Sequence, residues 1–279
     1  MNLRLALPAV VLGSTLALAA CSTDADSDAA ASATGTDSAT DTSLTDVEDA
    51  GVLIVGTEGT YRPFTFHADG TGDLTGYDVE VARAVAEQLG VEVEFEETQW
   101  DALLTGLEAG RFDAVFNQVG ITPEREEVYT FSTPYTYSNG VLVTTEDNTD
   151  IASFDDLEGR TLAQSLTSAF GQQAKNAGAN IEAVEGWAQS VELLQQGRVE
   201  ATINDKLTWL DYANTNGENG LKVAAETDDY SQSAVALAGG DQALADAISE
   251  ALGTLAEDGT LAEISNEFFG DDVSVEPAA

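Results

Sequence analysis

Arg125 stands where elementary electrostatics disfavours a cation. The stretch NQVGITPERE, residues 117–126, predicts a helix with Thr122 as its N-cap and Pro123 at its first position, so Arg125 falls in the first turn. The N-terminal end of a helix already carries partial positive charge, which repels a guanidinium. Two explanations are open. Arg125 pairs with a neighbouring glutamate on the surface, or the arginine and the helix end both bind an anion that is not part of the chain.

Three further stretches could bring polar groups to the same place. Each follows an expected strand, and in open α/β sheets ligands bind beyond the carboxyl ends of the strands, where helix N-termini point. The stretches are GTEGTYRPF with Glu58 and Tyr61, SLTSAF with Thr167 and Ser168, and IND, which ends in Asp205.

Together these groups suit a zwitterion. Arg125 can bind a carboxylate through two parallel hydrogen bonds, and free backbone N–H groups near Thr167 and Ser168 add donors at a helix start. Asp205 and Glu58 can accept hydrogen bonds from an ammonium group. The repulsion at Arg125 disappears if a carboxylate lies between the guanidinium and the helix ends.

Structural roles compete with these assignments. Asp205 can simply cap the helix that follows it, and Thr167 or Ser168 is an N-cap in either case. Tyr61 and Trp100 can cover the apolar surface of a ligand, or they can pack in the protein core. The residue types alone leave these alternatives open.

The charge balance excludes several classes of partner. The 279-residue chain carries 50 Asp and Glu against 10 Lys and Arg, for a formal net charge of −40. Affinity for nucleic acid comes from cations on phosphates, so neither nucleic acid nor an acidic macromolecule is expected as a partner. The one histidine, His67, lies in a loop and is expected to be solvated. With one histidine and one cysteine, no metal site of the His/Cys type is available, and no cofactor is expected.

The N-terminus has the features of an export signal. Residues 1–20 contain Arg4 and then an apolar run too short to span a bilayer as a mature helix, which predicts a signal peptide. The run ends in LAAC, which resembles a bacterial lipobox, so we expect cleavage before Cys21 and a diacylglycerol on its thiol. Residues 21–47 are then a disordered acidic tether. In this interpretation the protein is lipid-anchored to the outer face of the cell membrane. An ordinary secretory signal with a chance cysteine is the alternative.

From Gly51 onward, expected strands and helices alternate. The expected strands are VLIVGT (52–57), VEVEFE (91–96) and FDAVF (112–116), separated by the helices YDVEVARAVAEQLG and WDALLTGLEAG. This order predicts a largely parallel α/β sheet with helices on both faces. A similar run begins near Phe154, and in it SVELLQQG is expected to form a helix capped by Ser190.

The two runs predict two α/β lobes. Residues 48–143 together with 234–275 are expected to form lobe 1, and residues 144–233 are expected to form lobe 2. Two amphipathic helices at the C-terminus return to lobe 1. Because the chain crosses between the lobes twice, near 141–147 and 229–235, we expect a two-strand hinge.

Several motifs resemble one bacterial family. VGTEGTYRPFTF, LTGYDVEVARAVAEQLG and WDALLTGLEAGRFDAVFNQVGITPERE, in this order, are similar to the polar-amino-acid branch of bacterial ABC-transporter solute-binding proteins. The likeness runs from about residue 48 to residue 275. It implies a two-lobed α/β fold of the type II periplasmic-binding-protein class, with the ligand cleft between the lobes. The stretches AQSLTS, NQVGIT and TINDKL look most like members that bind cystine or related sulfur-containing amino acids.

The resemblance also implies a role for each candidate residue. An arginine in the position of Arg125 clamps the α-carboxylate of the ligand, and an aspartate in the position of Asp205 holds its α-ammonium group. The other implied contacts are backbone donors near Gly120, Thr167 and Ser168, aromatic walls from Tyr61 and Trp100, and polar contacts from Glu58, Asn117 and Gln118. Relatives often carry serine where Asn117 and Gln118 stand, so these positions are expected to influence ligand choice.

The implied mechanism is capture by closure. A monomer closes its hinge around an L-amino acid and presents the closed surface to an ABC permease in the membrane. Other polar amino acids, such as glutamine or glutamate, are alternative ligands. A small-molecule dehydratase on the same fold is a further alternative, with Glu58 as its one acidic candidate. A lone carboxylate is weak support for catalysis, so we do not expect an enzyme.

Overall fold

The computed structural model describes residues 40–217 and 219–277. The described residues belong to one compact unit. The expected signal peptide, Cys21 and most of the expected tether lie outside the described residues. Within the described ranges, no helix is both long enough and apolar enough to cross a membrane.

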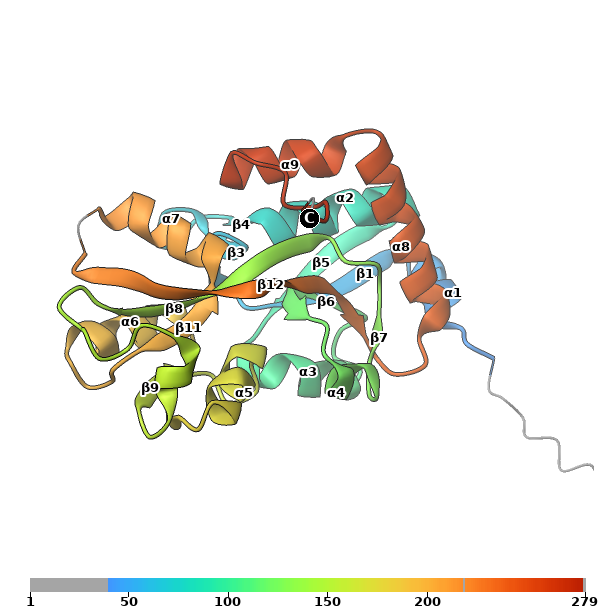
Figure 1. Cartoon of the computed structure of the whole chain (residues 1–279). Coiled ribbons are helices and arrows are strands. Elements are labelled where there is room, and N and C mark those ends of the chain that lie inside the picture. Colours follow the sequence, from blue (N-terminus) through green and yellow to red (C-terminus); the bar gives the residue numbers. More distant parts are fainter. Residues whose placement is uncertain (1–39, 218, 278–279) are drawn as a thin grey trace, which may run out of the picture. The chain divides into compact units, whose positions relative to one another are not determined.

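A long mixed sheet runs through the molecule (Figure 1). Its strand order is β11-β8-β12-β6-β1-β5, with β7 paired to β12. The strands are β1 (Val52–Thr57), β5 (Glu92–Glu97), β6 (Ala114–Gly120), β7 (Thr130–Phe131), β8 (Thr136–Thr145), β11 (Thr202–Asp205) and β12 (Leu221–Leu237). β1 pairs in parallel with β5 and β6, whereas the β6–β12, β12–β8 and β8–β11 pairs are antiparallel. The predicted parallel arrangement therefore holds only for β1, β5 and β6, because the return strand β12 runs against its neighbours.

Helices cover both faces of the first lobe, which contains β1, β5 and β6 (Figure 1). The helices are α2 (Tyr77–Leu89), α8 (Gln242–Glu257) and α9 (Thr260–Phe269) on one face and α3 (Trp100–Glu108) on the other. Alternating residues of β1 pack against the helices on the two opposite faces of the sheet. Leu53 and Val55 pack in the core with α2 and α8, and Ile54 packs with the leucines of α3. As predicted, α2 ends at Gly90, whose left-handed φ of 75° closes the helix.

The expected tether ends earlier than predicted. Helix α1 (Ser43–Ala50) places Val47 in the first-lobe core, at 3% exposure, with Leu44 packed against the same cluster. The start of this segment caps α8, because the Asp41 carboxylate accepts from the Ala243 N–H at 2.6 Å and the Ser43 hydroxyl accepts from the Leu244 N–H at 3.2 Å. An apolar pair at i and i+3 was too short a signal to separate this helix from the acidic segment before it.

The second lobe has a smaller parallel sheet and three helices. Its elements are β9 (Thr161–Gln164), α5 (Ala169–Asn176), β10 (Asn180–Ala183), α6 (Trp187–Gln195), β11 and α7 (Lys206–Asn216). β9 and β10 pair in parallel. The prediction that Ser190 caps α6 is wrong by four residues. The helix begins at Trp187 after the N-cap Gly186, and Ser190 lies inside it, where its hydroxyl donates to the Gly186 carbonyl at 3.2 Å.

Two strands connect the lobes. β8 and β12 pair from Thr136 opposite Ser233 to Thr145 opposite Leu221, and Figure 1 shows them side by side through the middle of the molecule. Their register is interrupted between Glu226 and Tyr230. A break in the ladder of two continuous connecting strands is a suitable place for bending, as the two-strand hinge requires.

Short elements complete the fold around the strand ends. After β1 the chain forms a small antiparallel sheet that carries Tyr61, and after β6 it forms one helical turn that carries Arg125. These elements are β2 (Thr60–Tyr61), β3 (Thr65–His67), the 3-10 turn η1 (Ala68–Gly70), β4 (Leu74–Thr75), α4 (Pro123–Glu126) and the 3-10 turn η2 (Phe154–Leu157).

Candidate ligand-binding site

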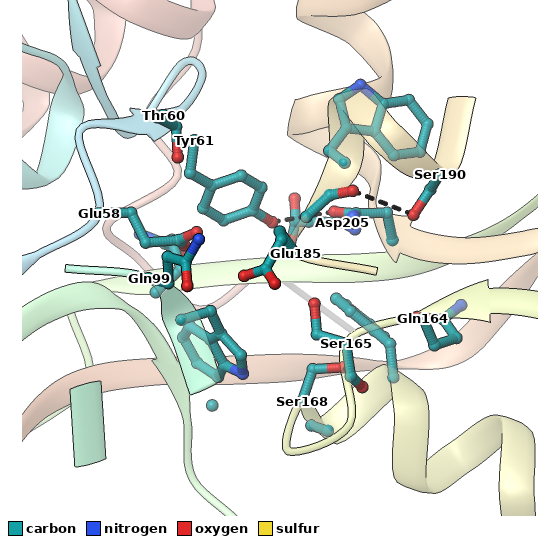
Figure 2. A pocket seen from close by; sticks show the side chains of 18 of the residues that line it. Glu58, Thr60, Tyr61, Gln99, Gln164, Ser165, Ser168, Glu185, Ser190 and Asp205 are labelled. Carbon is teal, nitrogen blue, oxygen red and sulfur yellow. Dashed lines mark hydrogen bonds between the residues drawn. The ribbon is translucent and has the colours of Figure 1, made fainter. Parts of the chain in front are cut away.

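A cavity of about 500 Å³ lies between the two lobes (Figure 2). This volume falls within the range of about 300–1,000 Å³ that is usual for small-molecule sites. Eight of the residues singled out from the sequence line it: Glu58, Tyr61, Trp100, Gln118, Gly120, Arg125, Ser168 and Asp205. Asn117 and Thr167 are not part of its wall, although both contact residues that are.

Arg125 is buried, at 9% exposure. The Thr122 hydroxyl accepts from the Arg125 N–H at 3.3 Å, so the predicted N-cap is confirmed. The guanidinium donates to the carbonyls of Gly120 at 2.7 Å and Thr167 at 3.1 Å, and its carbon lies 5.5 Å from the centre of the Trp100 ring. No ion pair within the described ranges includes Arg125, so surface pairing with a glutamate is wrong. Burial lowers the pKa of Arg125, because it disfavours the charged form, and the negative charges of Tyr129 and Glu124 oppose this only in part.

Asp205 caps α7 and also faces the cavity. Its Oδ1 accepts from the Leu207 N–H at 2.8 Å and from the Ser138 hydroxyl at 2.7 Å, so the capping role is confirmed. Both bonds use the same oxygen, and none of the hydrogen bonds among the described residues uses Oδ2. Burial at 5% exposure raises the pKa of Asp205 to about 6, against the effect of these two donors. A cation at Oδ2 would favour the charged form.

Tyr61 reaches across the cavity to the second lobe. Its hydroxyl donates to Oδ1 of Asn204 at 2.9 Å, and the same oxygen accepts from the Asp205 N–H at 2.7 Å. Asn204 also lines the cavity, yet nothing in the sequence distinguished it from other polar residues of an alternating strand. Tyr61 packs against Phe64 with ring centres 5.1 Å apart, so it is both a core aromatic and a cavity wall.

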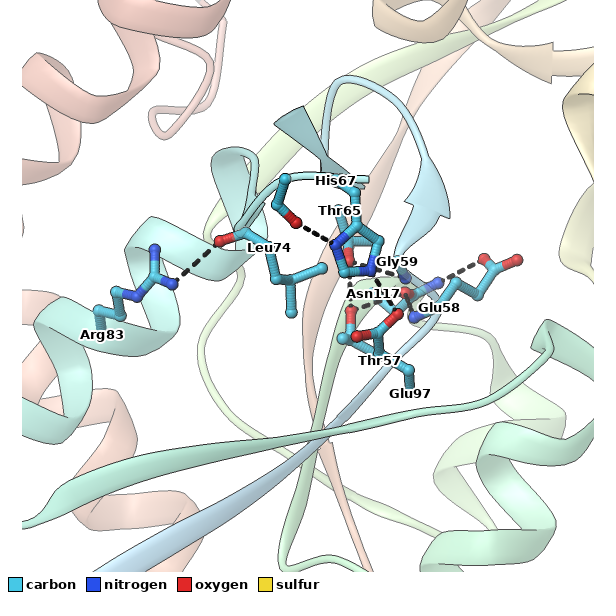
Figure 3. A network of polar contacts seen from close by, with 10 residues as sticks. Thr57, Glu58, Gly59, Thr65, His67, Leu74, Arg83, Glu97 and Asn117 are labelled. Carbon is cyan, nitrogen blue, oxygen red and sulfur yellow. Dashed lines mark hydrogen bonds and ion pairs between the residues drawn. The ribbon is translucent and has the colours of Figure 1, made fainter. Parts of the chain in front are cut away.

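Asn117 positions Glu58 (Figure 3). The Asn117 amide is fully buried, where its oxygen accepts from the Glu58 N–H at 2.8 Å and the Thr57 hydroxyl at 3.0 Å. Its Nδ2 donates to Oε2 of Glu58 at 2.7 Å. Burial, opposed by this hydrogen bond and supported by the charges of Asp101 and Glu185, raises the pKa of Glu58 to about 7. Asn117 therefore acts on the cavity through Glu58.

Gln118 has a strained backbone, with a φ of 51° in the left-handed region that non-glycine residues rarely adopt. The register between β6 and β12 shifts at this point, between Ala234 and Ala236. The bulge turns the Gln118 amide inward, where Nε2 donates to Oδ1 of Asp78 at 2.7 Å and to the Thr136 hydroxyl at 3.0 Å. Because the amide nitrogen is already bonded inside the protein, it is not free to donate to a ligand.

The Thr167–Ser168 turn serves as both cap and lobe contact. The Ser168 hydroxyl accepts from the Gly171 N–H at 3.0 Å, so Ser168 is the N-cap of α5. Thr167 donates to Oδ1 of Asp101 in the first lobe, from its hydroxyl at 2.6 Å and its N–H at 3.2 Å. These bonds, together with the Arg125 bond to Thr167 and the Tyr61 bond to Asn204, hold the lobes in contact over the cavity.

Trp187 packs inside the second lobe and also faces the cavity. Its ring packs edge-on against Tyr212, with centres 5.7 Å apart, and it also lines the cavity. The indole nitrogens of Trp187 and Trp100 are both buried, and neither has a hydrogen-bond partner among the described residues. Two aromatic walls therefore face the cavity from different lobes.

His67 is paired, whereas a solvated side chain was expected. Nδ1 lies 2.8 Å from the Gly72 carbonyl oxygen and Nε2 lies 2.8 Å from Oε2 of Glu97 (Figure 3). Both partners are acceptors, so the protonated imidazolium satisfies both contacts. The Glu97 hydrogen bond first, and then the Gly72 bond, raise the pKa of His67. His67 thereby provides a positive partner for Glu97, which lines the cavity.

Known proteins are similar to this chain in both sequence and fold. Residues 53–271 match the bacterial extracellular solute-binding proteins, family 3. The chain is 50% identical over 239 residues to the L-cystine-binding protein TcyA of Bacillus subtilis, and the match covers 85% of this chain and 89% of that protein.

Two solved structures, one unliganded and open and one bound to a ligand, have a similar fold. The L-cystine solute receptor of Neisseria gonorrhoeae, in its unliganded open conformation, is 47% identical over 84% of this chain and 99% of that one, with a TM-score of 0.56. An ancestral arginine-binding protein bound to arginine is 33% identical over 79% of this chain and 99% of that one, with a TM-score of 0.74. The arginine-bound structure therefore superposes better than the unliganded open structure, although its sequence is less similar.

Proposed function

The chain belongs to the bacterial extracellular solute-binding proteins of family 3, and from that membership we propose that it captures L-cystine outside the cell and delivers it to an ABC importer. The observation that carries this proposal is a buried Arg125 without an anionic partner among the described residues, at the wall of a cavity that Asp205 also lines. A desolvated cation and a desolvated anion facing one cavity suit the α-carboxylate and the α-ammonium group of an amino acid.

Each residue then has a separate task. Arg125 holds the α-carboxylate, with backbone donors near Gly120 and Ser168. Oδ2 of Asp205 holds the α-ammonium group, and Tyr61 and Trp100 cover the apolar middle of the ligand. In the same proposal Asn117 and Thr167 act indirectly, because Asn117 fixes Glu58 and Thr167 joins the lobes. Gln118 contributes backbone groups to the binding site, because its side-chain nitrogen is already bonded inside the protein.

Cystine is the ligand we propose because two similar proteins carry that specificity in their names, at 50% and 47% identity. Arginine is the first alternative, since an arginine-bound ancestral protein superposes with a TM-score of 0.74. Glutamine and glutamate are further alternatives. Transport rather than catalysis is supported by the solute-binding family itself.

Delivery would depend on closure and on location. The proposed lobes are residues 48–143 with 234–275, and residues 144–233, which move about β8 and β12. A lipid on Cys21 would keep the monomer at the outer face of the membrane and raise its local concentration at the permease. The family description supports export, and the lipid anchor is an extension of it.

Thermal unfolding of the compact unit from Thr40 onward tests the ligand. A ligand at about a hundred times its dissociation constant stabilises by roughly 2.7 kcal/mol, or several degrees for a protein of this size. We expect a shift with L-cystine and a smaller or absent shift with arginine, glutamine and glutamate. The buffer must be free of reductants, and the single cysteine at position 21 is absent from this unit. A shift with arginine alone would refute the cystine assignment, and no shift with any amino acid would refute the proposed function.

A further inference from the structure

Besides Asp205, two carboxylates in the cavity have no cationic partner among the described residues. Arg125 and Asp205 are assigned to the α-groups of the ligand, and Glu97 is paired with a histidine. Glu58 and Glu185 also line the cavity, and neither belongs to an ion pair in the described part of the chain. A bound α-amino acid that contacts only Arg125 and Asp205 leaves these two negative charges uncompensated at the cavity wall.

The two carboxylates come from opposite lobes. Glu58 follows β1 in the first lobe, and Glu185 directly precedes Gly186, the N-cap of α6 in the second lobe. A Cβ atom at Gly186 would lie 3.9 Å from Oε1 of Glu58, so the chain at 185–186 approaches Glu58 closely. Asn117 already binds the other oxygen, Oε2. Figure 2 shows both carboxylate side chains within the cavity.

Electrostatics makes this arrangement unfavourable while the cavity is empty. Burial, together with the charges of Asp101 and Glu185, raises the pKa of Glu58 to about 7, even though Asn117 donates to it. Two like charges brought together from separate lobes oppose closure. A cation between them favours the charged form of Glu58 and removes the repulsion that opposes closure, since each carboxylate gains a charged hydrogen-bond donor.

We propose that Glu58 and Glu185 bind a second amino group of the ligand, one carboxylate from each lobe. This inference rests on the proposed function and extends it, because the site then selects amino acids that carry a distal ammonium group. Cystine has such a group at its far end. The distal ammonium group also links the lobes, so that closure around a ligand with two amino groups is favoured over closure around a ligand with one.

Two mixed disulfides test the assignment. S-(2-carboxyethylthio)-L-cysteine is cystine without the distal amino group, and S-(2-aminoethylthio)-L-cysteine is cystine without the distal carboxylate. Dissociation constants of both, and of L-cystine, are measured by calorimetry on the unit from Thr40 onward. We expect the compound without the amino group to bind about 10- to 100-fold more weakly than the compound that keeps it, the usual effect of a charged hydrogen bond. Equal affinities, or the reverse order, would overturn the proposal.

Glutamine variants distinguish the effect of Glu58 and Glu185 on the distal amino group from the effect of the protein's overall negative charge. In Glu58→Gln and in Glu185→Gln, the ratio of the two dissociation constants should fall toward one. Glu192→Gln removes the same charge from α6, at an exposed residue outside the cavity wall, and should keep the wild-type ratio. If all three variants change the ratio alike, the preference for the compound with the distal amino group comes from the protein's overall negative charge, and the proposal fails. If wild-type protein binds none of these compounds and no cystine, the proposed function fails instead.

Discussion

The hydroxyl of Tyr61, in the first lobe, donates a 2.9 Å hydrogen bond to Oδ1 of Asn204, in the second lobe. The same oxygen accepts from the backbone N–H of Asp205 at 2.7 Å. Two consecutive hydrogen bonds therefore connect an aromatic wall of one lobe to the residue proposed to hold the ligand's ammonium group. We therefore expect closure of the lobes and binding of the ammonium group to depend on one another.

Tyr61→Phe should weaken ligand binding about fivefold to tenfold, because it removes one hydrogen bond of the closed form and keeps the ring. Calorimetry with L-cystine measures this loss. Tyr230→Phe is the matched control, since its hydroxyl donates to the Pro277 carbonyl outside the cavity. An unchanged affinity in Tyr61→Phe would mean that the bond to Asn204 does not contribute to closure.

Asp205→Asn should separate the capping role from the binding role. Asparagine caps helices about as well as aspartate, so the free energy of unfolding should change by no more than about 1 kcal/mol. The variant loses the negative charge proposed to hold the ammonium group, and affinity should fall roughly 100-fold. Thermal unfolding and calorimetry on the same sample measure both quantities. A lower melting temperature with unchanged affinity would leave Asp205 with only its capping role.

The stability of the unliganded protein should fall as the pH rises from about 4 to about 7. Asp78 is fully buried, and burial raises its pKa from 3.8 to about 7. The folded state therefore holds a proton that the unfolded state has released, and stability decreases with pH through this window. Glu58 and Asp205, whose pKa values are also raised, act in the same direction.

Asp78→Asn tests this dependence, because the amide oxygen can still accept from Gln118 and cannot ionise. The difference between the melting temperatures at pH 5 and pH 8 should be smaller in this variant than in the wild type. The exposed Asp73→Asn should keep the wild-type difference. An equal pH dependence in Asp78→Asn would contradict the assignment of the buried proton to Asp78.

Local sequence patterns were sufficient to predict much of the fold and to identify Arg125 as a candidate binding residue. The apolar run VLIVGT predicted β1, the alternation in VEVEFE predicted β5, and Gly90 closes α2. At Arg125 the signal was an inconsistency between residue type and position. Thr122 and Pro123 determined the helix start, and the unfavourable place of the cation in that turn indicated a missing anion.

Other features depended on contacts between distant parts of the chain. The inward turn of Gln118 follows from a bulge against β12, which no local pattern encodes. Helix α1 is stabilised by packing on α8, about 200 residues later, as shown by the 202-residue separation of Asp41 and Ala243. Glu185 directly precedes the N-cap of α6, and only the approach of the two lobes brings it near Glu58.

Calorimetric titration of Arg125→Ala with L-cystine tests the central claim most directly. The guanidinium already has its backbone acceptors at Gly120 and Thr167, and the proposal assigns its remaining donors to the ligand carboxylate. We predict loss of detectable binding with a folded protein, while Arg111→Ala, which removes a half-exposed arginine of the same lobe, binds as the wild type does. Wild-type affinity in a folded Arg125→Ala would contradict the account, because the buried cation would then have no part in recognising the ligand.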